Sequence, residues 1–279
     1  MKRWGPAIDA TVLVMLLGAG LASPYGVARW YGALAAAFVG IAGSILALES
    51  MATWISERSS ARLQGPRTRP RLAWRGARDT ALASLVAASL LAWPLARMGA
   101  GEPTGLVWTL EEAGGLGPTI GGNLLAVLVL DAWLYWKHRL LHTGAFFAFH
   151  RAHHAYRDPT SLSSFAVGPV ESLLTFWPIV LVAFPWAPHY APVYFTLVGV
   201  FVVLNLYLHS GVSSRLVEAT LPRLYVNTSA FHNRHHANAD VNFGEALTLW
   251  DHLLGTREGD RRDPRPKPAP ASSAGPSAA

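Results

Sequence analysis

The chain has 279 residues, of which 51% are hydrophobic and only 14% are charged, whereas about a quarter of the residues of a soluble domain are charged. This composition predicts a membrane protein, and the absence of cysteine excludes disulfides, thiolate zinc sites and cysteine-held iron–sulfur clusters. The net charge of +6 comes largely from arginines in one loop and in the tail, a distribution typical of the cytoplasmic flanks of membrane spans. No nucleic-acid partner is therefore expected.

Six apolar segments follow one another along the chain, each close to the roughly 20 residues that a spanning helix needs. They are Ala7–Ala22, Trp30–Leu48, Asp79–Ala96, Thr119–Trp136, Phe165–Trp186 and Pro192–Leu208. We interpret the first as a retained span and not as a signal peptide, because Ser23-Pro24 is a poor cleavage context. The last two are joined by a short turn and either span fully or form a re-entrant hairpin, because prolines interrupt the first arm.

The charges of the loops predict the orientation of these segments. The loop at 57–78 is rich in arginine and is therefore expected on the cytoplasmic side. The loop between the third and fourth segments is mostly acidic and is expected on the opposite side. The fourth segment then returns to the cytoplasm at Lys137, so the histidine-rich sequence that follows should lie on the cytoplasmic face. His189 lies in the turn between the fifth and sixth segments and is therefore expected on the opposite side.

Nine of the eleven histidines fall into tight groups with a shared spacing. A pair lies four residues apart, two triplets repeat the pattern His-x-x-His-His, and one histidine stands alone between the triplets. Residues three and four apart share a helix face, and neutral imidazole is the commonest metal ligand in proteins. In each triplet the first and last residues share a face and the middle one is rotated, so a triplet can bind one ion and reach toward its neighbour.

The grouped histidines are the predicted metal ligands, and they suffice for two ions with four or five ligands each. They are His138, His142, His150, His153, His154, His209, His232, His235 and His236. Iron, zinc, copper and nickel are all compatible with nitrogen ligands. Repetition of the spacing argues against scattered interfacial histidines, whereas His252 lies outside every group.

The histidine groups belong to a wider ordered pattern between Asp131 and Thr256. The pattern reads Asp131-x-x-x-Tyr135-x-x-His138-Arg139-x-x-His142, then the first triplet, Asn205-x-x-x-His209, the second triplet, Asn242-Phe-Gly244 and Trp250-Asp251-x-Leu-Leu-Gly255-Thr256. In this order the motifs resemble those of the fatty acid hydroxylase/sterol desaturase superfamily, which are integral-membrane di-iron oxygenases. Many members have His-Pro-x-Glu after the second histidine motif, whereas this chain has Gly168-Pro169-Val170-Glu171, a departure that bears on the substrate subgroup.

The resemblance implies an all-α integral membrane protein, in which a four-helix transmembrane bundle is capped by a cytosolic helical, histidine-rich metal domain. It implies two iron ions, replaceable by zinc during purification, that use dioxygen to hydroxylate an unactivated C–H bond of a lipid-like or sterol-like substrate from the bilayer. A separate electron-transfer protein, cytochrome b5-like or a ferredoxin with its reductase, is then required. The alternatives are a desaturase on the same scaffold, a non-redox zinc protein, and a metal-dependent hydrolase, for which a carboxylate base such as that of His-Glu-x-x-His is lacking.

Three further residues are candidate catalytic residues that act beside the ligands, namely Asp131, Tyr135 and Asn205. Asp131 and Tyr135 continue the helical stripe of the first histidine pair and are expected to orient imidazoles or to bond elsewhere in the bundle. Asn205, one turn before His209, is expected to reach a metal through water or to bond a neighbouring helix. Glu171 is expected at the cytosolic rim, bound to backbone or to an arginine.

The expected organisation has three parts. Residues 1–117 form N-terminal transmembrane helices with the arginine-rich cytosolic loop, and residues 118–258 form the catalytic domain similar to fatty acid hydroxylases. Residues 259–279, which are rich in Pro, Ala, Ser and Arg, form a disordered tail.

Overall fold

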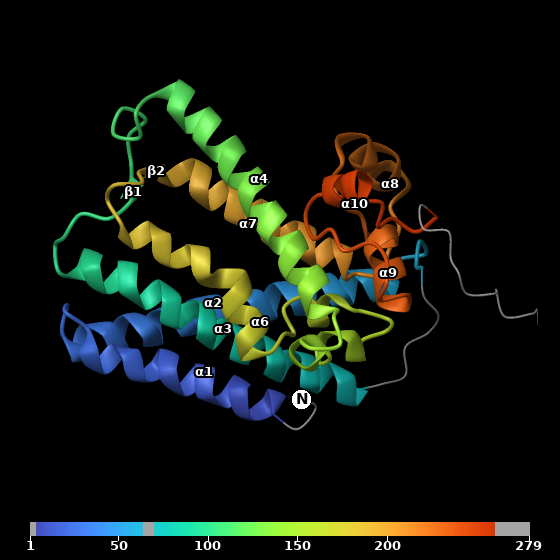
Figure 1. Ribbon diagram of the computed structural model, residues 1–279, viewed down its shortest axis with the longest axis horizontal. Helices are drawn as coiled ribbons and strands as arrows, with labels where there is room; N and C mark the ends of the chain where they lie inside the picture. Colours follow the sequence, from blue (N-terminus) through green and yellow to red (C-terminus); the bar gives the residue numbers. More distant parts are fainter. Residues whose placement is uncertain (1–3, 64–69, 260–279) are drawn as a thin grey trace, which may run out of the picture.

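The computed structural model describes residues 4–63 and 70–259, and this part of the chain is almost entirely helical (Figure 1). The long elements are α1 (Gly5–Ala19) with η1 (Gly20–Ala22), α2 (Val27–Arg58), α3 (Pro70–Gly99), α4 (Leu116–Leu141) and α7 (Ala191–Leu208). The short helices are α5 (Phe147–His150), η2 (His153–Ala155), η3 (Ser161–Ser163), α6 (Pro169–Phe176), η4 (Trp177–Ala183), α8 (Arg215–Thr220), η5 (Leu221–Leu224), α9 (Ser229–Ala237) and α10 (Leu249–Leu254). The predicted fold class is confirmed, while the predicted tail, except for Gly259, lies outside the described residues, as do residues 64–69 of the arginine-rich loop.

Five helices of the described residues are long and apolar enough to cross a membrane, whereas the sequence offered six apolar segments and the resemblance implied a four-helix bundle. The five helices are Gly5–Ala22, Val27–Arg58, Ala73–Gly99, Leu116–Leu141 and Ala191–Leu208, and the chain is an integral membrane protein. In Figure 1 the long helices occupy most of the molecule, whereas α8, α9 and α10 gather at one end. The long helices thus form the bundle, and α8, α9 and α10 belong to its cap.

Small residues bring α2 and α3 close together. Ala88, Ala92 and Ala96 of α3 are buried against Trp30, Leu34 and Ala37 of α2. Small side chains permit the close backbone approach on which helix packing in membranes depends. Gly20 contributes in the same way, because a Cβ atom at this position would occupy the space of the Trp30 ring. This packing fixes the N-terminal helices as one layer.

The fifth apolar segment of the sequence forms a broken arm, α6 followed by η4, and not a regular spanning helix. Pro178 lies in the first turn of η4 and has no N–H to continue the α-helical bonding. With rises of about 1.5 Å per α-helical residue and 2.0 Å per 3₁₀ residue, the two pieces extend roughly 26 Å, close to the thickness of a bilayer core. After the arm, β2 (His189–Tyr190) pairs in parallel with β1 (Leu106–Val107), at the end of the molecule opposite α8, α9 and α10 (Figure 1).

Polar side chains of the N-terminal helices, of which Glu49 and Thr53 are buried and Asp9 is partly buried, hold the segment that follows the first histidine triplet. The hydrogen bonds run from Val170 N to Asp9 Oδ1 (3.0 Å), from Phe165 N to Glu49 Oε1 (3.3 Å) and from Leu162 N to Thr53 Oγ1 (3.1 Å). Asp9, which interrupts the first apolar segment of the sequence, thus accepts a hydrogen bond in the first turn of α6, where helices favour an acceptor. The bundle therefore positions the chain between the histidine motifs.

Candidate metal centre

The structure brings all nine grouped histidines together at the cap end of the bundle. They come from the end of α4, from α5 and η2, from the residue after α7, and from α9. They form two adjacent groups, and within each group the candidate ligand atoms all lie within 4.8 Å of one another. The five-histidine group is His138, His142, His150, His154 and His235, and the four-histidine group is His153, His209, His232 and His236.

The two triplets are shared between the groups in a crossed manner. His150 and His154, the first and last residues of the first triplet, enter the five-histidine group, while the middle residue His153 enters the other group. In the second triplet the first and last residues enter the four-histidine group, and the middle residue His235 enters the five-histidine group. The i, i+4 relation keeps two imidazoles on one face and turns the third away, so each triplet contributes to both groups.

The ring nitrogens in each group face one another at short range. Five pairs of Nε2 atoms lie 3.0–3.3 Å apart: His138–His142, His153–His209, His209–His232, His154–His235 and His232–His236. In three of these residues a backbone carbonyl lies 2.8–2.9 Å from Nδ1: Phe243 O for His138, Asn205 O for His209 and Val241 O for His235. A carbonyl oxygen only accepts, so Nδ1 carries the proton in these three rings and Nε2 presents a lone pair.

These nitrogens fit a metal ion. Lone pairs that converge in a buried site repel one another unless a cation lies between them. Protons are poor candidates for that cation, because burial lowers the pKa of His154 to about 2, that of His142 to about 3 and that of His235 to about 4. The imidazoles therefore remain neutral, which is the form that binds metals.

Glu171 holds the ring of His150, which corrects our expectation for this residue. Instead of lying at the rim, Glu171 is buried, and its Oε1 accepts a hydrogen bond from His150 Nδ1 at 2.8 Å. The bond leaves the buried Nε2 of His150 without a partner among the described residues, ready to bind an ion. A carboxylate behind a metal-binding imidazole fixes the tautomer and the direction of the ring.

Asp131 and Tyr135 do not hydrogen-bond to a histidine. The Asp131 carboxylate accepts from the backbone N–H groups of Ala246 (3.2 Å) and Leu247 (3.0 Å) and from Trp250 Nε1 (2.9 Å). The hydroxyl of Tyr135 lies 2.9 Å from Thr256 Oγ1. Both residues thus tie α4 to the C-terminal part of the cap.

Asn205 contacts a candidate ligand through its backbone and not through its side chain. Its carbonyl accepts from His209 Nδ1, as described above, while its side-chain Nδ2 donates to Ser164 O at 2.9 Å. Of our two expectations, the bond to a neighbouring segment describes the side chain.

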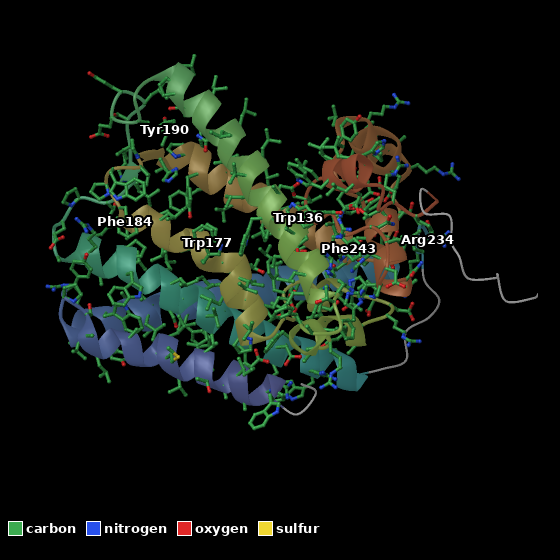
Figure 2. The ribbon with its side chains drawn as sticks, in the orientation of Figure 1. Trp136, Trp177, Phe184, Tyr190, Arg234 and Phe243 are labelled. Atoms are coloured by element: carbon green, nitrogen blue, oxygen red, sulfur yellow. The ribbon has the colours of Figure 1, made fainter. Side chains whose placement is uncertain are left out.

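The segment 241–244 supplies orienting groups that we did not predict, since the carbonyls of Val241 and Phe243 hold two candidate ligands. Asp251 accepts from Phe243 N (2.9 Å) and Gly244 N (2.6 Å), which fixes this segment. Asn242 has the left-handed conformation (φ 60°), which asparagine tolerates better than most residues. The motif Asn242-Phe-Gly244 was the available signal, but it does not reveal a role for the backbone carbonyls. In Figure 2 Phe243 lies near the C-terminal end of α4, whereas Phe184 and Tyr190 lie at the opposite end of the molecule.

The two histidines outside the groups lie apart from the candidate centre. His189 belongs to β2 at the far end of the bundle, and His252 is exposed on α10 beside Arg257.

A small cavity of about 50 Å³ adjoins both histidine groups. Five of the candidate ligands line it: His138, His150, His153, His209 and His232. Its apolar wall comes from α6, α7 and the segment before α6: Phe165, Val167, Phe176, Phe201, Leu204 and Leu208. The cavity therefore joins the candidate metal centre to the apolar part of the bundle.

This combination of a membrane bundle and two imidazole groups agrees with a sequence comparison. Residues 123–256, a little under half of the chain, match the family model of fatty acid hydroxylases, and this match supports the resemblance of the histidine motifs to the fatty acid hydroxylase/sterol desaturase superfamily.

Individual relatives share the same region. Lathosterol oxidase of Mus musculus is 33% identical over 130 residues, which cover 45% of this chain and 41% of the relative. A Delta(7)-sterol 5(6)-desaturase of Gibberella zeae is 30% identical over 157 residues (53% and 41%), and C-4 methylsterol oxidase of Schizosaccharomyces pombe is 32% identical over 138 residues (45% and 43%). The chain thus spans only about two fifths of the length of these relatives, and no solved structure matches it.

Proposed function

We propose that the chain is a membrane oxygenase that hydroxylates an unactivated C–H bond of a lipid-like or sterol-like substrate with dioxygen and two iron ions. One observation carries this proposal: two adjacent buried groups of five and four imidazoles beside an apolar cavity. The names of the relatives, sterol oxidases and sterol desaturases, support oxidation of a lipid. A desaturase on the same scaffold is the second candidate, because desaturases are among these relatives.

In this proposal each histidine group holds one ion. Iron in such a ligand set supplies dioxygen activation when it is bound, and zinc is a possible substitute after purification. The chain itself provides neutral imidazoles whose direction is fixed by Glu171 and by the carbonyls of Asn205, Val241 and Phe243. Phe165, Phe176 and Phe201 exclude water from the side of the cavity where an apolar substrate would lie.

We further propose that the centre faces the cytoplasm. Arg62, in the arginine-rich loop, forms an antiparallel β-bridge with Val212, three residues after His209, so the described start of this loop lies at the same end of the bundle as the candidate centre. Because arginine-rich loops remain on the cytoplasmic side, the substrate would enter from the cytosolic leaflet.

A separate electron-transfer protein, cytochrome b5-like or a ferredoxin with its reductase, would supply the electrons. Exposed arginines beside the histidine motifs support docking of an acidic partner. They include Arg151, Arg157 and Arg234, of which Arg234 lies at the outer edge of the cap in Figure 2.

We also propose that residues 118–258 form the catalytic unit, that residues 1–117 support it and that residues 259–279 form a tail. The contacts of Asp9, Glu49 and Thr53 with the segment after the first triplet indicate that the N-terminal helices help to shape the centre. The unit is therefore expected to depend on them.

Metal content, oxygen uptake and lipid products of the same preparation test the proposal. We expect two ions per chain, and oxygen consumption with a reductant when iron is bound. Loss of His153 and loss of His235 to alanine should each remove activity and weaken one site, because the two residues belong to different groups. His252→Ala is the matched control and should retain both ions. Two tightly bound zinc ions without oxygen uptake after iron loading would instead support a non-redox zinc protein.

A further inference from the structure

The cavity beside the candidate centre has one polar corner. Lys137, Thr175 and Glu245 line it. The Lys137 ammonium donates to Glu245 Oε1 at 2.8 Å and to Thr175 Oγ1 at 2.9 Å, and its side chain is only 3% exposed. These bonds use two of its three N–H groups, and the third has no hydrogen-bond partner among the residues that the structure describes. The corner therefore retains a hydrogen-bond donor.

An ion pair at this place is costly for the fold. Lys137 is buried near the C-terminal end of α4, one residue beyond the fourth apolar segment of the sequence, and removing two charges from water costs several kcal/mol that their attraction repays only in part. Ionisable residues that are buried near the membrane commonly serve the passage or binding of a ligand. The apolar wall opposite the corner contrasts with it, because a cavity for plain hydrocarbon requires no ammonium group.

The polar corner lies next to the part of the cavity that the candidate metal ligands line. Lys137 directly precedes His138, and Glu245 Oε1 lies 3.9 Å from His138 Nδ1. The cavity of about 50 Å³ has room for only about four water molecules if each needs about 10–15 Å³ by this measure. A group held by Lys137 is thus separated from the candidate ions by only a few atoms.

We propose that Lys137, Thr175 and Glu245 form a subsite that binds a neutral oxygen, a hydroxyl or a carbonyl, located a few bonds from the carbon that is oxidised. The subsite rests on the proposed oxygenase function and defines its substrate class as a lipid with an uncharged oxygen near the reacting carbon. An acid such as a free fatty acid fits poorly. Glu245 already neutralises the ammonium, so the corner offers no net positive charge to a carboxylate.

Three small photoreactive probes test the subsite without enzyme turnover. Each is a methyl diazirine with a two-carbon chain that ends in a hydroxyl, a methyl or a carboxylate, so that the narrow chain end can enter the small cavity. The protein in nanodiscs is irradiated with each probe, and labelled peptides are quantified by mass spectrometry. Labelling of the cavity residues Phe201 and Leu204 is divided by labelling of the exposed residues Leu124 and Leu125 on α4, which corrects for partitioning into lipid.

The hydroxyl probe should give a labelling ratio about tenfold above that of the methyl probe. A tenfold preference corresponds to about 1.4 kcal/mol, which is slightly less than a hydrogen bond to a charged group usually contributes. The carboxylate probe should give the lowest ratio. In Lys137→Met the preference for hydroxyl should disappear. The double variant Lys137→Met/Glu245→Gln should also lose the preference for the hydroxyl probe, and it leaves no buried carboxylate without a partner. Arg97→Met, which breaks an ion pair with Glu102 (3.3 Å) outside the cavity, is the control and should keep the preference.

Equal ratios for the hydroxyl and methyl probes in the unaltered protein, or a preference that survives in both Lys137 variants, would overturn the subsite. Metal content and oxygen uptake of the same samples separate this result from the proposed function. A protein that binds two ions and consumes oxygen but shows no preference remains an oxygenase without this subsite. A protein that prefers the hydroxyl probe but binds no metal retains the subsite and loses the oxygenase proposal.

Discussion

Replacement of Glu171 should weaken one of the two metal sites selectively. Its carboxylate is buried and accepts from His150 Nδ1 at 2.8 Å, and His150 belongs to the five-histidine group. Loss of such an outer partner usually lowers metal affinity by about 10–100-fold, which corresponds to about 1.4–2.8 kcal/mol. In Glu171→Ala the buried N–H also loses its acceptor, at a further cost of about 1–3 kcal/mol in folding stability. Glu171→Gln keeps an oxygen acceptor and should lose less.

Competition with a chelator of known affinity, followed by metal analysis, measures this effect. We expect one ion to leave Glu171→Ala at a chelator concentration that the unaltered protein resists, and the second ion to be retained. Glu112→Gln is a suitable control, because the side chain of this exposed glutamate bonds, among the residues that the structure describes, to the segment Trp108–Thr109. Unchanged affinity for both ions in Glu171→Ala would refute the assigned role of the carboxylate, and equal weakening of both ions would refute the division into two groups.

Three further predictions concern stability. The metal-free protein should lose stability as the pH falls below about 6.5, the ordinary pKa of histidine. Burial lowers the pKa of His142 to about 3 and that of His235 to about 4 in the folded protein, so the unfolded chain binds more protons in this range. A melting temperature unchanged between pH 7.5 and pH 5 would contradict this prediction. Gly168→His should destabilise the protein by about 1–3 kcal/mol, because a Cβ atom there would lie 3.2 Å from Asp9 Oδ2. In a double-mutant cycle, Asp9→Ala should relieve part of that cost, and strict additivity would show that the two positions are uncoupled. Asp131→Ala should lower the melting temperature by removing three hydrogen bonds to the cap, while Asp131→Asn, which still offers an acceptor, should lower it less.

Local patterns predicted the helical class and the approach of the histidines, because hydropathy and i, i+4 spacing act over one or two helical turns. The crossed sharing of the triplets follows from the same spacing. The sequence did not decide whether the fifth apolar segment spans the membrane as a regular helix or is interrupted. The structure resolves it at Pro178, where the α-helix gives way to a 3₁₀ helix.

Contacts between distant residues could not be predicted in this way. Glu171 lies 21 residues from His150, and Asp9 lies 161 residues from Val170, so their partners depend on how α6 docks against α5 and α1. The carbonyls of Val241 and Phe243 carry no side-chain signal at all. Asp131 lies on the same helical stripe as the first histidine pair, but its carboxylate accepts from the backbone at 246–247. This contact also depends on tertiary packing and could not be predicted from the spacing.

The crossed triplets have a consequence for how ions load. Each short helical segment that carries a triplet sends two imidazoles to one group and one to the other, so ordering the segment around a first ion also places a ligand of the second. That ligand is then already ordered when the second ion binds, so binding of the second ion loses less conformational entropy. We therefore expect the first ion to raise the affinity for the second, so that a titration of the metal-free protein is steeper than for two independent sites.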